Sequence, residues 1–270
     1  MRKRILIIFI CLFSAFTLDA QKKKLYSIGE IKTINSGILA ESRTLNIYLP
    51  DGYNEKEKYP VIYLLDGSAN EDFLHIVGLV QFFNMTFKMP KTIIVGIANV
   101  DRKRDFSFPT NNADFKKTYP TTGGSVKFIE FIEKELQPFI KASYKIKDTS
   151  YLIGQSFGGL LATEILLKKP YLFTNYIIVS PSLWWDDESL LKAAPALLTG
   201  QTDSKKWVYI SVGVEGKEME ECAAGLVKAL QNSGKKNMKV DFVPLPKENH
   251  ATILHNSVYE ALKISYPYKE

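Results

Sequence analysis

One serine in this chain of 270 residues lies where serine can act as a nucleophile. Ser156 is the centre of Gly154-Gln155-Ser156-Phe157-Gly158, between an apolar stretch at 150–153 and an amphipathic stretch at 157–168. A serine on a tight turn between a strand and a helix exposes its hydroxyl, and flanking glycines leave room for that backbone and for a substrate. The pattern indicates a nucleophilic serine. The alternative is a glycine-rich turn whose serine takes no part in chemistry.

A serine hydroxyl needs a base to take its proton, and histidine is the usual base. The chain has three histidines. His75 lies in an apolar run, where a packed or capping histidine is expected, and His255 lies within the final predicted helix. His250 follows the last predicted strand on a loop that leads into this helix, where folds with a serine elbow place the base. We therefore predict that His250 is the general base.

An acid that orients the imidazole is expected after the strand predicted at 207–212, because the order along such chains is serine, acid, histidine. The segment Gly213-Val214-Glu215-Gly216-Lys217-Glu218 follows this strand. Glu215 lies closest to the strand end and is the predicted acid. Glu218 is the alternative, and either carboxylate could simply begin the next helix, since acidic side chains favour the first turn.

Backbone N–H groups are expected to stabilise the negative charge that develops on the substrate oxygen. The first is the N–H of Phe157, directly after the predicted nucleophile. The second is expected from the loop after the strand predicted at 61–65, where Gly67 or Ser68 would be the donor. The predicted oxyanion hole therefore consists of Phe157 and one of these two residues.

Short apolar runs alternate with amphipathic stretches along the chain, which is typical of a βαβ architecture with a mostly parallel sheet. Two opening strands separated by a turn at 35–37 predict an antiparallel start, and six buried strands follow. The predicted strands are 24–31, 43–49, 61–65, 92–98, 150–153, 175–180, 207–212 and 239–243, and the predicted helices are 125–141, 157–168, 218–231 and 251–262. The expected fold class is α/β, with a mostly parallel central sheet of about eight strands and helices on both faces.

The composition is that of a globular protein, because 46% of the residues are hydrophobic and 24% are charged. Disordered, collagen-like and coiled-coil classes are thereby excluded. The formal net charge of +6 is mild, and basic residues are scattered among acidic ones. A nucleic-acid partner is therefore not expected.

The first twenty residues have the three parts of a secretory signal peptide. Arg2-Lys3-Arg4 precede an apolar run at 5–13, and the segment ends at Leu18-Asp19-Ala20. A membrane anchor is the alternative, but the run is shorter than the roughly 20 residues of a spanning helix. The sequence therefore predicts export to the periplasm or the exterior of a bacterial cell, with no stable membrane span after cleavage.

The mature chain reads as one catalytic domain at 21–270, since it contains no repeat, low-complexity tract or linker. Cys11 lies inside the predicted signal peptide, so Cys222 is the only cysteine left after cleavage. No internal disulfide is then possible. A stable core rather than disulfides is expected to hold the exported domain together.

Six motifs occur in a fixed order along the chain. They are Tyr63-Leu64-Leu65-Asp66-Gly67, Val95-Gly96-Ile97-Ala98-Asn99, Arg102-Lys103-Arg104-Asp105-Phe106, Gly154-Gln155-Ser156-Phe157-Gly158-Gly159, Ser180-Pro181-Ser182-Leu183-Trp184-Trp185 and Asn249-His250. In this combination the chain resembles the esterase D-like esterases of the α/β-hydrolase superfamily, and most of all the branch with ferric-siderophore esterases of the enterobactin and bacillibactin type. The resemblance spans roughly residues 26 to 265.

This resemblance implies an α/β-hydrolase fold and serine-dependent hydrolysis of a small-molecule or carbohydrate-linked ester, without a metal or organic cofactor. It carries the catalytic roles over to Ser156 and His250. Members of the family place the acid variably, so Glu215 remains an inference from its position. The resemblance also suggests substrate contacts from two motifs at the carboxyl ends of parallel strands, where open α/β sheets bind ligands. These contacts are Arg102, Arg104, Trp184 and Trp185.

The residues leave alternatives open. The arginines could hold their own loop through Asp105, and the tryptophans could be the core of a lid. An acyltransferase of the mycolyltransferase type would share this fold and this elbow, and would pass the acyl group to a sugar hydroxyl instead of water. A non-catalytic binding protein on the same scaffold is a further alternative, although such proteins usually lack the serine or the histidine.

Overall fold

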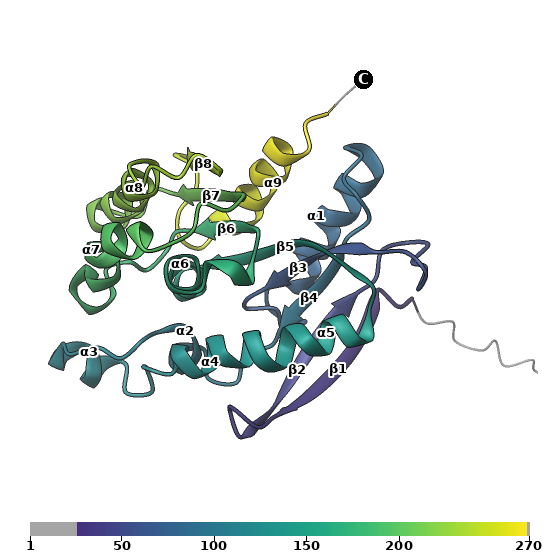
Figure 1. Cartoon of the computed structure of the whole chain (residues 1–270), viewed down its shortest axis with the longest axis horizontal. Coiled ribbons are helices and arrows are strands. Elements are labelled where there is room, and N and C mark those ends of the chain that lie inside the picture. Colours follow the sequence, from purple (N-terminus) through teal and green to yellow (C-terminus); the bar gives the residue numbers. More distant parts are fainter. Residues whose placement is uncertain (1–25, 269–270) are drawn as a thin grey trace, which may run out of the picture.

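The computed structural model describes residues 26–268, and its centre is one sheet of eight strands in the order β1-β2-β4-β3-β5-β6-β7-β8 (Figure 1). The strands are β1 (Gly29–Ser36), β2 (Glu41–Tyr48), β3 (Tyr59–Leu64), β4 (Ile93–Ile97), β5 (Ile146–Gln155), β6 (Asn175–Val179), β7 (Lys206–Val212) and β8 (Met238–Pro244). Strand β2 runs antiparallel to both of its neighbours, and β3 to β8 are parallel. The predicted α/β-hydrolase fold class is thereby confirmed.

Helices cover both faces of the sheet (Figure 1). The helices are α1 (Phe73–Thr86), α2 (Arg102–Phe106), α3 (Ala113–Thr118), α4 (Ser125–Phe131), α5 (Gln137–Ser143), α6 (Phe157–Lys168), α7 (Trp185–Thr199), α8 (Lys217–Gln231) and α9 (Ile253–Ser265). Helices α1 and α9 pack together over one face, and α4, α5, α6 and α8 pack over the other. Two apolar cores result, one on each side of the sheet.

The continuous apolar sequence of β3 follows from the burial of both of its faces. Ile62 and Leu64 pack into the core under α1 and α9, whereas Val61 and Tyr63 pack into the core on the other face. Successive side chains of a strand point to opposite faces, so a central strand that is covered on both sides has to be apolar at every position.

The strand order reverses between β3 and β5, which are neighbours in the sheet. From β3 the chain moves outward to β4, and from β5 it moves in the opposite direction to β6, β7 and β8. In open α/β sheets such a reversal leaves a crevice at the carboxyl ends of the two strands. Asp66 and Gly67 follow β3 and Ser156 follows β5, so the predicted oxyanion loop and the predicted nucleophile lie at this point.

The first strand and the turn of the opening hairpin lie further along the chain than predicted. Strand β1 ends at Ser36 and the turn covers 37–40, whereas the sequence predicted a strand at 24–31 and a turn at 35–37. The start of that predicted strand lies partly outside the described residues. Glu135 accepts hydrogen bonds from the N–H groups of Gly37 at 2.9 Å and Ile38 at 3.1 Å. A side chain almost one hundred residues away therefore sets the position of the turn.

The helix predicted at 125–141 is continuous from 125 to 143 but contains one wide π turn, Ile132–Leu136. Pro138 is the second residue after this turn and has no N–H to donate, and the Gln137 N–H donates to the Ile132 carbonyl five residues earlier. Helices α1, α2, α3 and α7 were not predicted from the sequence. Helix α7 contains Pro195 and begins with three residues of positive φ, so it lacks a regular helical pattern.

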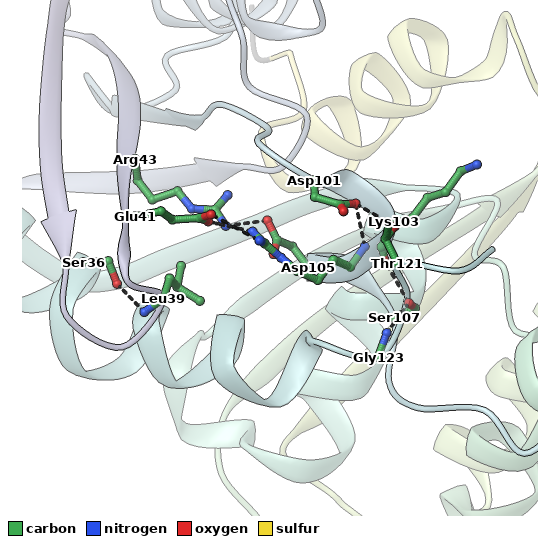
Figure 2. Close-up of polar contacts among 11 residues, drawn as sticks. Ser36, Leu39, Glu41, Arg43, Asp101, Lys103, Asp105, Ser107, Thr121 and Gly123 are labelled. Atoms are coloured by element: carbon green, nitrogen blue, oxygen red, sulfur yellow. Dashed lines mark hydrogen bonds and ion pairs between the residues drawn. The ribbon is translucent and has the colours of Figure 1, made fainter. Parts of the chain in front are cut away.

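A buried ion network ties the opening hairpin to α2. The Arg43 guanidinium is fully buried, and it pairs with Glu41 on its own strand and with Asp105 of α2 at 2.6 Å. Arg104 binds the same two carboxylates, at 2.6 Å and 2.8 Å. Figure 2 shows Glu41, Arg43 and Asp105 converging between the hairpin and α2. Two cations and two anions therefore compensate one another between these elements.

Across residues 26–268, the helices are all too short or too polar to cross a bilayer. The predicted signal peptide at 1–20 lies outside the described residues and stays a prediction.

Candidate active site

Ser156 occupies a strained turn between β5 and α6, with φ +59° and ψ −119°. Two glycines near this turn have no room for a side chain. A Cβ on Gly154 would lie 2.4 Å from the carbonyl oxygen of Gly158. A Cβ on Gly159 would lie 2.9 Å from Cα of Pro181. Gly154 and Gly159 are therefore required by close packing of backbone against backbone. The half-buried Ser156 side chain projects from this turn at the carboxyl end of β5.

Glu215 and His250 form a direct pair. Oε2 of Glu215 lies 2.5 Å from Nδ1 of His250, although 35 residues separate them along the chain. The other carboxylate oxygen accepts hydrogen bonds from the hydroxyl of Ser180 and, at 2.9 Å, from the N–H of Gly213. The Glu215 side chain is only 2% exposed, whereas that of His250 is 47% exposed. A buried carboxylate thus holds one side of an imidazole that is about half exposed.

The electrostatics of Glu215 favour its ionised form. Burial by itself raises the pKa of Glu215, but hydrogen bonds from His250, Ser180 and a backbone N–H outweigh burial and lower this pKa below its ordinary value. The carboxylate is therefore ionised at neutral pH. Because the folded-state pKa is lowered, the stability that this group contributes is present above its ordinary pKa and is lost as the pH falls through the lowered value.

Glu218, the alternative acid, lies in the first turn of α8 and is exposed. Within residues 26–268, Glu218 makes no hydrogen bond or ion pair with His250. Its neighbour Glu220 accepts from the backbone N–H groups of Glu215 and Gly216 at 3.1 Å and 3.2 Å. The loop that carries Glu215 is therefore held by a carboxylate that the sequence analysis did not single out.

Three polar residues around Ser156 were missed by the sequence analysis. The Ser182 hydroxyl lies 3.3 Å from the Ser156 hydroxyl, and the Ser182 N–H donates to the Ser156 carbonyl at 3.1 Å. The Gln155 side-chain amide donates to the His250 carbonyl, which ties the histidine loop to the elbow. Ser180 and Ser182 belong to a motif at the end of β6. Their position at the edge of the sheet where ligands bind could have identified them from the sequence.

The two segments predicted to supply oxyanion donors both follow the carboxyl ends of strands, but one of the candidate N–H groups is already paired. Phe157 is the first residue of α6, so its N–H has no acceptor within the helix. The Gly67 N–H donates to the Ile97 carbonyl at 3.0 Å and is therefore not available to a substrate. Ser68 remains, because its N–H has only a long contact of 3.4 Å to the Glu71 carboxylate.

The structure gives both predicted substrate arginines internal partners. Arg104 belongs to the buried network with Glu41 and Asp105, so the expectation that it binds substrate is wrong. Arg102 binds Asp66 with two hydrogen bonds, from Nε at 2.6 Å and from Nη2 at 2.9 Å. Its guanidinium is thus directed at the loop after β3. Both arginines hold loops in place, which was the alternative explanation from the sequence.

The two predicted substrate tryptophans occupy different environments. Trp185 is fully buried, and its indole N–H donates to the Phe108 carbonyl at 2.9 Å, so it is part of the core and not of a binding surface. Trp184 is half-buried, and its ring centroid lies 5.8 Å from that of Phe157, next to the nucleophile. Tyr119 also packs near these rings. Trp184 is therefore the tryptophan that a ligand at Ser156 can reach.

Within residues 26–268, no three His, Cys, Asp or Glu side chains are grouped as metal ligands. The groups at the carboxyl ends of the strands are a serine hydroxyl, an imidazole paired with a carboxylate, and the backbone N–H groups of Phe157 and Ser68. Together with the sheet topology, they define the chain as an enzyme of the serine-hydrolase class with an α/β-hydrolase fold.

Comparison with known proteins narrows this class. Residues 36–251 match the family described as "Putative esterase", and the chain belongs to this family of carboxylic ester hydrolases. The ferri-bacillibactin esterase BesA of Bacillus subtilis is 30% identical over 250 residues, which cover 83% of this chain and 86% of that protein. The solved structure of an IroE-like serine hydrolase from Shewanella oneidensis has a TM-score of 0.80 at 30% identity and covers 88% of this chain and 80% of its own. The solved structure of the BES protein of Bacillus cereus has a TM-score of 0.78 at 28% identity and covers 90% of this chain and 96% of its own. The predicted family is thereby confirmed.

The pairing of His250 with Glu215 and not with Glu218 predicts unequal effects of two matched substitutions. Glu215→Gln keeps the shape but removes the charge that stabilises the imidazolium, and it is expected to lower kcat on p-nitrophenyl acetate by about two to four orders of magnitude. Glu218→Gln is expected to leave kcat within about twofold, because it changes an exposed carboxylate of α8. If both variants stay within about threefold of the parent, the enzyme works without an orienting acid.

Proposed function

We propose that this enzyme hydrolyses carboxylic esters through a covalent acyl-enzyme on Ser156. The observation that carries the proposal is the contact of 2.5 Å between Glu215 and His250, together with the hydrogen bond from Gln155 that ties His250 to the strained elbow of Ser156. In the first step, the Ser156 oxygen bonds to the ester carbonyl carbon while His250 takes the hydroxyl proton. The alcohol then leaves with that proton. Water next loses a proton to His250 and attacks the acyl carbon, which releases the acid and restores Ser156.

The charge that develops on the carbonyl oxygen needs donors in both steps. We assign this role to the N–H groups of Phe157 and Ser68, because the first has no helical acceptor and the second has only a long contact. The ionised Glu215 carboxylate holds Nδ1–H of His250, so the opposite ring nitrogen is the one that accepts the serine proton. It also compensates the positive charge of the imidazolium.

Removal of the nucleophile tests this mechanism. Ser156→Ala is expected to lower kcat by at least about three orders of magnitude without loss of the cooperative unfolding transition, since the side chain is half-buried and small. A fluorophosphonate probe is expected to label the parent enzyme once, at Ser156, as shown by peptide mass spectrometry. Retained hydrolysis in Ser156→Ala, or a label on another residue, contradicts the proposal.

For the substrate, we infer a small-molecule ester that carries aromatic groups. One support is the name of the relative from Bacillus subtilis, which acts on ferri-bacillibactin. The other is the aromatic wall formed by the half-buried Trp184 against Phe157, because aromatic rings pair favourably with such a surface.

A substrate panel with one matched pair of variants tests this inference. The panel contains p-nitrophenyl acyl esters, acetylated and feruloylated xylan, and a catecholate trilactone. Trp184→Leu is expected to raise KM about tenfold for the aromatic esters and to leave p-nitrophenyl acetate within about twofold. The control, Tyr171→Leu, removes an exposed aromatic ring at the amino ends of the strands and is expected to change neither value. Highest kcat/KM on acetylated xylan, or preferential acyl transfer to an added alcohol, contradicts the assignment.

We also propose that the enzyme acts outside the cytoplasm, in the periplasm or beyond it. The support is the basic start, apolar run and small-residue end of residues 1–20. N-terminal sequencing of the protein purified from its host is expected to begin at Gln21. A mature protein that begins at Met1 contradicts export by a cleaved signal.

A further inference from the structure

The two proposed oxyanion donors belong to different loops. Ser68 lies on the loop after β3, and Phe157 lies at the start of α6 after β5. Both N–H groups must point at one oxygen atom, and a misplacement of about 1 Å can cost about a hundredfold in rate. A contact that bridges the two loops therefore has direct consequences for catalysis.

Arg102 makes such a bridge. Its Nε and Nη2 donate to the two carboxylate oxygens of Asp66, which is two residues before Ser68. The same Nη2 donates to the Gln155 carbonyl at 3.2 Å, directly before the nucleophile. The Gln155 side chain in turn donates to the His250 carbonyl. One guanidinium thus joins the oxyanion loop, the nucleophile elbow and, through Gln155, the histidine loop.

Asp66 lies deep enough for this contact to control its position. The residue is 7% exposed, and it has a left-handed backbone with φ +54°. Its Oδ2 lies 3.4 Å from the position of a Cβ on Gly158, so the carboxylate packs against the first turn of α6. Burial raises the pKa of Asp66, and hydrogen bonds from Arg102 and Asn99 oppose that rise. Loss of Arg102 would leave a buried carboxylate without its cation beside the elbow.

The helix that presents Arg102 is itself anchored at both ends (Figure 2). Asp101 accepts hydrogen bonds from the Arg104 N–H at 3.0 Å and from the Thr121 hydroxyl at 3.1 Å. At the other end, Asp105 belongs to the buried network with Arg43. A helix of only five residues can therefore hold its first side chain in one place.

We propose that Arg102 is a positioning residue that sets the distance between the two oxyanion donors by binding Asp66 and Gln155. This inference rests on the proposed serine mechanism. It assigns Arg102 no contact with the substrate, in contrast to an arginine that binds an anionic ester.

The test compares Arg102→Lys with Asp66→Asn, with the double variant and with Lys127→Met. Lysine keeps the positive charge but cannot form the two-pronged contact, and Lys127 is an exposed cation on α4 that controls for the loss of one charge. Activity is measured on neutral p-nitrophenyl acetate and on anionic mono-p-nitrophenyl succinate. The rate of Ser156 labelling by a fluorophosphonate, in which a serine–phosphorus bond forms and fluoride leaves, reports on the site without turnover. Urea unfolding monitors the fold.

Arg102→Lys is expected to lower kcat about a hundredfold on both esters, to change KM less than about twofold and to slow labelling by a similar factor. The double variant is expected to lose no more than the worse single variant, since the two side chains act as one contact. Lys127→Met is expected to match the parent.

Three results overturn the inference while the proposed function stands. The first is an unchanged kcat with a raised KM for the anionic ester alone, which identifies a substrate contact. The second is an Arg102→Lys variant with parental kcat and labelling. The third is loss of the cooperative unfolding transition in both single variants, which identifies a purely structural pair. A parent enzyme that neither hydrolyses the esters nor reacts with the probe overturns the proposed function itself, and the inference with it.

Discussion

The backbone of Ser156 is held in a conformation that L-residues rarely adopt, and much of the surrounding structure serves to keep it there. Such a residue costs about 1–3 kcal/mol, which its neighbours must supply. The Ser156 N–H donates to the Val179 carbonyl at 3.0 Å, and its carbonyl accepts from Leu160 at 2.9 Å and from Ser182. Strand β6 and helix α6 therefore restrain the turn from both sides, and the glycines around it allow the close approach.

Three arginines in this protein hold elements relative to one another. Arg104 and Arg43 join the opening hairpin to α2, and Arg102 joins α2 to the loop after β3. A buried ion pair adds little net stability compared with apolar packing, because desolvation opposes the attraction. Its geometry is nevertheless specific, since a guanidinium and a carboxylate meet in a planar fork. These pairs therefore contribute more to the positions of the loops around the active site than to the stability of the fold.

The predicted strands that carry the site were found within a few residues of their expected positions, because buried parallel strands have continuous apolar sequences. The errors have separate physical causes. The hairpin turn was misplaced because Glu135 captures its N–H groups. Gly67 was one of two candidate oxyanion donors, but its N–H pairs with Ile97. Trp185 and Arg104 were placed at the ligand on the strength of residue type and position, which do not report burial.

The sequence by itself determined the order of the eight strands, the glycine-flanked serine elbow and the position of the histidine after the last strand, because these depend on local periodicity and on spacing along the chain. Only the tertiary structure decided which polar groups face one another. Arg102 and Asp66 are 36 residues apart, and Arg104 and Glu41 are 63 residues apart. A cation that pairs over such a distance has the same sequence signature as one that binds a substrate, and only the contacts of the folded chain distinguish the two.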